Sequence, residues 1–261
     1  MLRSVKELEK CSIEATDGVI GRVEDFYFDD ERWVIRYLVV RAGAWLFERR
    51  VLISPLSIRQ TGWASGIVPA SITREQVKNS PSIDTDQPVS RQYENAYYGY
   101  YGYPRYWGGM GLWGGHGNPT MMMPSLSHTR GEAEIASDLR AQEDPHLRSC
   151  NAVRGYHVHA SDGEIGHVSG YLVDETSWAI RFFILDTSHW WLGHRVLVAS
   201  EWISGVDWAL STVTTGLGRD AIKEAPTFDP ELSLDASGER SLYSHYGRPA
   251  YRDDAIRAGV A

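Results

Sequence analysis

The sequence has few cysteines and no long apolar run, and each shortage excludes a class of protein. Two cysteines, Cys11 and Cys150, are too few for a disulfide framework or a closed zinc site. No run of about 18 apolar residues occurs, so no segment is expected to span a membrane. The opening MLRSVKELEK lacks the apolar core of a signal peptide, which makes the cytoplasm the expected location.

Excess positive charge and catalytic motifs are also missing. The formal charge is −8 at pH 7 and no long segment is basic overall, so direct nucleic-acid binding is not expected. The sequence contains no phosphate-binding loop, no dinucleotide fingerprint in a βαβ unit and no G-x-S-x-G elbow. We therefore expect a protein that is not an enzyme and that needs no cofactor.

What the sequence does contain is an internal repeat. Shifted by about 145 residues, the chain aligns with itself without a gap, residues 2–106 against 147–251. Roughly 31 of about 105 aligned positions are identical, and one register holds throughout. The two copies are therefore expected to share one fold.

The segment between the copies has a different composition. Residues 93–117 are rich in Gly, Tyr and Trp, and an acidic stretch follows further on. Because glycine raises the entropic cost of ordering, we predict a flexible linker here. The predicted parts are a first domain (1–83), its tail (84–106), the linker (107–146), a second domain (147–228) and a partly disordered second tail (229–261).

Each copy has the pattern of short strands between closely spaced turns. In the first copy, Val19–Phe28 largely alternates apolar with polar residues, and Trp33–Val40 is almost continuously apolar. Thr73-Arg-Glu-Gln76 fits a capping box and predicts a short helix over residues 72–79. The fold class is predicted to be all-β dominated, with two small barrels, each followed by a short helix and a Tyr/Pro-containing tail. The residues assigned to turns and bends are Asp17, Gly18, Gly21, Asp162, Gly163 and Gly166.

Several of these motifs together resemble the PRC-barrel domain family. They are the D-G-x-x-G turns at Asp17 and Asp162, the apolar strands that begin at Trp33 and Trp178, and the later W-L…R-V-L segments of both copies. The first copy departs from the family pattern at Arg41. The resemblance implies a small barrel that serves as an interaction module, as in the reaction-centre H subunit and a ribosome maturation factor.

The sequence offers only weak candidates for metal-binding or acid–base residues. His157 and His159 lie two residues apart, so on a strand they share a face and are the weak candidates for a metal site. The first copy does not repeat them, and a solvated strand face explains them better. The recurring acidic pair Asp29 and Asp30 precedes a tryptophan, and a role in an exposed turn is favoured over catalysis.

Aromatic and basic residues are the best candidates for partner binding. A loop of each copy carries tryptophans next to an arginine that recurs, and such loop aromatics often anchor protein partners. The predicted partner-binding residues are Trp45, Arg49, Arg50, Trp190, Trp191 and Arg195. Tyr98 and Tyr101 either fold back onto the first barrel or form a sticky binding segment, and the sequence leaves both open.

The favoured function is a scaffold in which the two barrels form an intramolecular pseudo-dimer and dock onto a larger protein assembly. The alternatives are a small-ligand or metal sensor at the interface between the barrels, and a factor associated with the ribosome or RNA processing. Any membrane association would be peripheral and through a partner.

Overall fold

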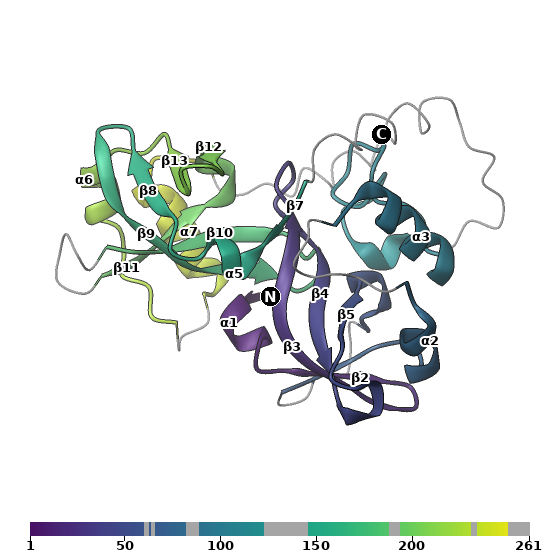
Figure 1. Ribbon diagram of the computed structural model, residues 1–261. Coiled ribbons are helices and arrows are strands. Elements are labelled where there is room, and N and C mark those ends of the chain that lie inside the picture. Colours follow the sequence, from purple (N-terminus) through teal and green to yellow (C-terminus); the bar gives the residue numbers. More distant parts are fainter. Residues whose placement is uncertain are drawn as a thin grey trace. The chain divides into compact units, whose positions relative to one another are not determined.

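The computed structural model describes residues 1–59, 63, 66–81, 89–122, 146–187, 194–230 and 234–249 (Figure 1). Among these residues no helix is long and apolar enough to cross a membrane. The chain forms two compact units. The first-repeat unit holds Leu8–Ser149 and Thr176–Trp178; the second-repeat unit holds Met1–Glu7, Cys150–Glu175 and the described residues from Ala179 onward.

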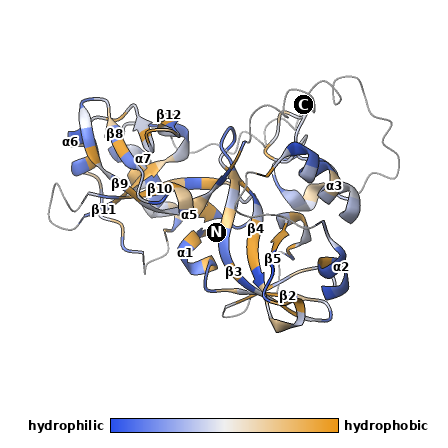
Figure 2. Ribbon diagram, viewed as in Figure 1, coloured by the Kyte–Doolittle hydropathy of each residue, from blue (hydrophilic) through white to orange (hydrophobic). Residues whose placement is uncertain are grey.

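The first-repeat unit is built on a six-stranded sheet in the order β5-β4-β3-β2-β6, with β7 paired to β3. Its strands are β2 (Ser12–Ala15), β3 (Gly18–Asp29), β4 (Val34–Ala42), β5 (Arg50–Ile53), β6 (Ile67–Pro69) and β7 (Leu147–Ser149). β4 is buried at every position but Arg41, as its nearly continuous apolar sequence requires, and hydrophobic colour covers much of it in Figure 2.

The second-repeat unit repeats this order in its seven-stranded sheet, β11-β10-β9-β8-β13-β12, with β1 paired to β9. Its strands are β1 (Leu2–Ser4), β8 (His157–Ala160), β9 (Gly163–Asp174), β10 (Ile180–Asp186), β11 (Arg195–Ala199), β12 (Ile203–Asp207) and β13 (Thr212–Thr215). The predicted all-β class is therefore confirmed.

Closed barrels are not found, which corrects the prediction. Among the described residues, no ladder joins the two ends of either sheet. In the first-repeat unit the chain leaves β5 through a 3₁₀ turn at Pro55–Ser57 and meets the β6 side by a single bridge between Ile58 and Ala70. A proline at the start of this turn has no N–H to offer a ladder, so strand pairing ends there.

The two N-terminal strands are exchanged between the repeats. β1, from the first repeat, pairs antiparallel with β9 of the second-repeat unit, Leu2 opposite Asp174. β7, from the second repeat, pairs with β3 of the first-repeat unit, Leu147 opposite Asp29. The two registers are equivalent, because each pair of partners is related by the repeat shift. The compact units thus do not follow the predicted domain boundaries.

An ion pair accompanies each exchanged strand. Arg3 Nε lies 2.7 Å from Glu175 Oε2, and Arg148 Nε lies 2.8 Å from Asp30 Oδ2. Glu175 and Asp30 are equivalent positions of the repeat. Both strands read Leu-Arg-Ser, so the same three side chains enter both sheets.

Short helices follow the strands in both units. The predicted capping box is present at Thr73, whose side chain accepts from the Gln76 N–H, and the helix it starts is one residue longer than its Gly218-capped counterpart. The helices of the two units are α1 (Val5–Leu8), α2 (Arg74–Asn79), α3 (Arg91–Tyr101), α5 (Cys150–Val153), α6 (Arg219–Lys223) and α7 (Ala236–His245).

Both tails pack within their own unit. Tyr97 and Tyr98 of α3 are buried, and so are Tyr243 and Tyr246 at the end of α7. Tyr97 donates to the Leu52 carbonyl of β5 at 3.1 Å. This resolves the alternatives left open by the sequence: Tyr98 folds back, while residues 250–261 lie outside the described part.

The predicted linker differs from expectation at residues 107–122. Trp113 is completely buried and donates from Nε1 to the Ser177 carbonyl at 2.7 Å. Arg36, also completely buried, donates to the Leu112 carbonyl at 2.6 Å and pairs with Asp29 at 2.8 Å. Asp29 is therefore a buried partner of Arg36 rather than an exposed turn residue. Residues 123–145 lie outside the described part.

Glu94 is a buried carboxylate at the centre of this packing. Its Oε1 accepts from the Tyr106 hydroxyl at 2.7 Å and from the Tyr37 hydroxyl at 3.2 Å, and Arg91 lies 2.8 Å from Oε2. Burial raises the pKa of the Glu94 carboxyl, and these partners only partly oppose the rise.

This raised pKa predicts a pH dependence of stability. Between the unfolded pKa, about 4.5, and the folded pKa, the folded state holds the proton that the unfolded state has lost. The contribution of Glu94 to stability is therefore greatest at low pH and is lost as the pH rises through the folded pKa. We expect Glu94→Gln to remove this fall from the pH profile of the free energy of unfolding. A profile unchanged by the substitution would contradict the raised pKa.

Candidate functional site

A turn and a helix of the first repeat meet through Asp17 and Arg74. Asp17 Oδ1 accepts from the Arg74 backbone N–H at 2.7 Å, which fixes the start of α2 against the turn before β3. Gly18 has φ +135°, and a Cβ there would lie 3.4 Å from the Arg74 side chain. The turn glycine thus supplies the backbone conformation and leaves room for the arginine above it.

Trp45 completes the site from a third element. It lies in the 3₁₀ turn Ala44–Leu46, and its Nε1 donates to the Ile20 carbonyl at 2.9 Å. This bond fixes the indole. The Arg74 guanidinium carbon lies 4.3 Å from the centre of the indole ring, a cation–π contact that orients the arginine.

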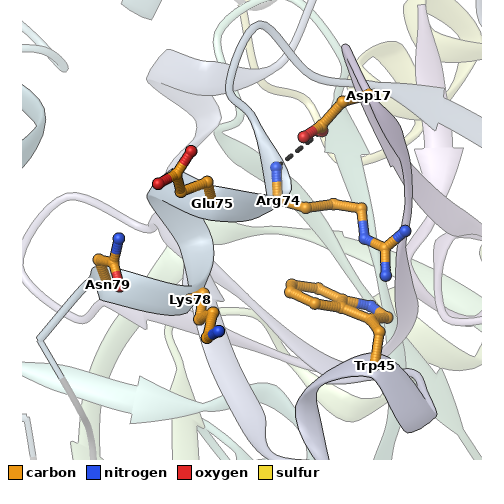
Figure 3. Close-up of a pocket in the computed structure, with 6 residues that line it drawn as sticks. All are labelled: Asp17, Trp45, Arg74, Glu75, Lys78 and Asn79. Atoms are coloured by element: carbon orange, nitrogen blue, oxygen red, sulfur yellow. Dashed lines mark hydrogen bonds between the residues drawn. The ribbon is translucent and has the colours of Figure 1, made fainter.

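These side chains line an open pocket of about 360 Å³ (Figure 3). The lining residues are Asp17, Trp45, Arg74, Glu75, Lys78 and Asn79. Figure 3 shows the Arg74 guanidinium over the Trp45 indole, Lys78 one helical turn further along, and Glu75 pointing away from the indole. Among the described residues, neither Arg74 nor Lys78 has a carboxylate partner within salt-bridge distance. Such a pocket offers a flat aromatic surface beside two cations.

Residues 2–63 match the PRC-barrel domain. No curated protein matches the chain. The match contains Asp17 and Trp45 of the pocket and ends before Arg74 and Lys78. The pocket therefore joins the matched PRC-barrel segment to the helix that follows it.

The PRC-barrel match does not reach the second repeat, whose membership of the family stays a prediction. Its sheet nevertheless keeps the strand order of the first, and its turn keeps the same contact. Asp162 Oδ1 accepts from the Arg219 N–H at 2.8 Å, and Gly163 has φ +138° beneath the Arg219 side chain.

Four of the six pocket residues recur unchanged in the second repeat, whereas Asn79 is replaced by Glu224. Asp17, Trp45, Arg74 and Lys78 are identical to Asp162, Trp190, Arg219 and Lys223. Glu75 is replaced by the shorter acid Asp220. Roughly 31 of about 105 aligned positions are identical overall, so this agreement on partly exposed charged residues exceeds the background. Surface positions vary more than buried ones, so this recurrence favours a shared role for these side chains.

The loop after Trp45 is strained. Phe47 and Glu48 have φ of 52° and 55°, in the left-handed region that residues with a Cβ rarely enter. The loop holds Phe47 94% exposed, although it is a large apolar side chain.

The predicted partner-binding arginines are not gathered in the pocket. Arg50 Nε donates to Glu24 at 3.1 Å on the exposed strand face, and Arg195 lies 4.0 Å from Asp186. Arg49 is half-buried, and its Nε and Nη2 have no hydrogen-bond partner among the described residues. Trp190 and Trp191 lie outside the described residues.

Gly21 and Gly166 allow two strands to approach closely. A Cβ on Gly21 would lie 1.9 Å from the Arg41 carbonyl oxygen, and one on Gly166 would lie 2.2 Å from that of Asp186. The register between β2 and β3 shifts next to Gly21. These glycines shape the sheet and do not line the pocket.

The histidine pair does not form a metal centre in the described residues. His157 Nδ1 lies 2.7 Å from Glu164 Oε1 on an exposed face of β8 and β9. No group of three potential ligands is found there or elsewhere in the described part. His159 is exposed on the same strand.

Arg74 and Lys78 were missed by sequence reasoning. The signal was present, because both recur in the second repeat and their spacing of four places them on one face of a helix. The capping box indicates only where the helix begins, and it says nothing about which of its side chains form a site.

Proposed function

We propose that this chain is a non-enzymatic interaction protein, in which two PRC-type domains dock onto a larger protein assembly through the first-repeat pocket and the corresponding residues of the second repeat. The first-repeat pocket, four of whose residues recur in the second repeat, is the observation that carries the proposal. Its aromatic surface and paired cations suit recognition of another protein's side chains, since Trp and Arg dominate binding energy at interfaces.

The proposal predicts that removing the pocket cations together with their second-repeat counterparts releases the partner. In the native cell, crosslinking and affinity capture of the full chain are expected to recover one dominant assembly. The variant Arg74→Ala/Lys78→Ala/Arg219→Ala/Lys223→Ala is expected to reduce recovery at least ten-fold, because desolvated charged contacts are lost.

A matched control separates this effect from a change in net charge. Lys6→Ala/Lys10→Ala/Arg22→Ala/Arg240→Ala removes four exposed cations outside the pocket, the same change in net charge, and should leave recovery unchanged. Circular dichroism and thermal unfolding check that all variants fold. Equal recovery from the four-residue variant and the wild type would contradict the proposal.

A second candidate function is a sensor that binds a small anion in the same pocket. A volume of about 360 Å³ falls within the range for small-ligand sites, at its lower end. A thermal-shift screen of carboxylates and phosphates tests it. Stabilisation of the wild type that is absent in Arg74→Ala would favour the sensor.

A further inference from the structure

The most exposed part of the site is the tip of the Trp45 loop. Phe47 is 94% exposed, two residues after a tryptophan that lines the pocket. An exposed phenylalanine contributes nothing to the core, and aromatic side chains that enter a partner's pocket are common anchors of protein interfaces.

The loop presents this side chain at a cost in backbone energy. Phe47 and Glu48 are consecutive residues in the left-handed region, each disfavoured by a clash between Cβ and backbone. Glycine would avoid the clash, and the second repeat has Gly193 at the position of Glu48. Its sequence has Leu192 at the position of Phe47, so a large apolar residue recurs at this position.

Uncompensated cations flank the loop. In the described part of the chain, Arg74 and Lys78 of the pocket have no carboxylate partner. An arginine stacked on an aromatic ring keeps its donor edge free for a carboxylate, which it binds in a bidentate manner. The partner surface that faces Arg74 and Lys78 is therefore expected to carry acidic side chains.

Building on the proposed function, we propose that Phe47 anchors a protein partner by entering an apolar socket. Carboxylates of the partner beside that socket bind Arg74 and Lys78. The partner segment thus combines apolar residues with Asp or Glu. Strained backbone conformations are typical of functional sites, where the residue is kept for binding although it costs folding energy.

Photo-crosslinking identifies the segment that contacts the tip. Benzoylphenylalanine is placed at Phe47 of the full chain in the native cell, and at the comparably exposed Leu210 as a control. We expect crosslinks from position 47 to map onto apolar residues of one partner, within a few residues of Asp or Glu. Crosslinks that map only to basic or uncharged polar segments would overturn the proposal.

Affinity and stability are then measured with the crosslinked segment as a synthetic peptide. Phe47→Gly removes the anchor and relieves the strain, so affinity should fall roughly 30-fold while the unfolding temperature holds or rises. Phe47→Leu copies the second repeat and should keep affinity within a few-fold. Glu48→Gly relieves strain without removing the ring and should keep affinity as well.

The outcomes separate this proposal from the proposed function. If Phe47→Gly binds the peptide as the wild type does, or lowers the unfolding temperature instead of the affinity, Phe47 is not an anchor, although docking through the pockets can still hold. If position 47 captures no partner and affinity capture of the full chain recovers no assembly, the docking function fails and this proposal fails with it.

Discussion

A disulfide is expected to form between positions 2 and 174 when Leu2→Cys and Asp174→Cys are combined in the full chain. Cys11→Ser and Cys150→Ala remove the native thiols beforehand. The two positions lie directly opposite each other in the pairing of β1 with β9. Opposite residues of antiparallel strands have Cα atoms about 4.5–5.5 Å apart, within the range that a disulfide bridges.

The new disulfide should also stabilise the chain strongly. It closes a loop of about 170 residues, and chain entropy predicts roughly 5 kcal/mol for such a loop before any strain. Mass spectrometry identifies the linked peptides, and denaturant unfolding with and without reductant measures the gain.

Two further pairs make the test decisive for strand exchange. Leu147→Cys with Asp29→Cys is the equivalent exchanged pair and should also close. Every variant that carries Asp29→Cys also carries Arg36→Met, so that no buried charge is left unpaired. Leu2→Cys with Asp29→Cys would close only if β1 paired within its own repeat, and we expect it to stay reduced. Ready oxidation of that unexchanged pair, with none across β1 and β9, would show that the exchange is wrong.

The sequence could not reveal this exchange, for a physical reason. β1 and β7 have the same three residues, and the strands that receive them offer equivalent registers. Arg3 finds an acid at Glu175, and Asp30 would have served it at the equivalent position of its own repeat. The local sequence pattern predicts that residues 2–4 and 147–149 form strands and which strand of a repeat they pair with. It does not predict whether that partner strand belongs to the same repeat or to the other one.

The strands themselves were predictable because their signals are local. The Asp17-Gly18 turn, the alternation after it and the apolar run before Arg41 give β3 and β4 nearly to the residue. Trp33 was placed at the start of the second strand. It instead precedes β4 with φ 55° and is only partly buried.

The pocket was missed because it depends on contacts distant in sequence. Asp17 and Arg74 are 57 residues apart, and each was interpreted only within its own turn or helix. Trp45 was recognised as a candidate from its neighbours in the loop. Its partner Arg74 emerges only when α2 is placed against the turn.

The folding of residues 107–122 was missed for a similar reason. Glycine-rich composition predicts flexibility, yet this segment supplies the Leu112 carbonyl and the Trp113 ring to a buried arginine. The Arg36 guanidinium carbon lies 3.9 Å from the Tyr106 ring centre and 4.8 Å from that of Trp113. In the sequence, Arg36 is one polar residue in an apolar strand. Nothing near it indicates that most of its contacts come from residues about 70 positions later in the chain.

This arginine carries the largest expected loss of stability. Arg36→Ala should destabilise the first-repeat unit by about 3–5 kcal/mol, because it leaves the buried Asp29 carboxylate without its countercharge. The Leu112 carbonyl and the two aromatic rings lose their contacts as well. We expect residues 107–122 to become sensitive to protease, and hydrogen exchange there to rise more than in the second-repeat unit.

Two variants test the cause of this loss. Asp29→Asn/Arg36→Met removes both charges and keeps most of the volume, so it should recover a large part of the stability. Arg32→Ala removes donors to the Gly109 and Gly111 carbonyls but leaves Asp29 paired, and should cost about 1 kcal/mol. If Arg36→Ala and Arg32→Ala unfolded at the same denaturant concentration, the buried ion pair would not be what holds this segment in place.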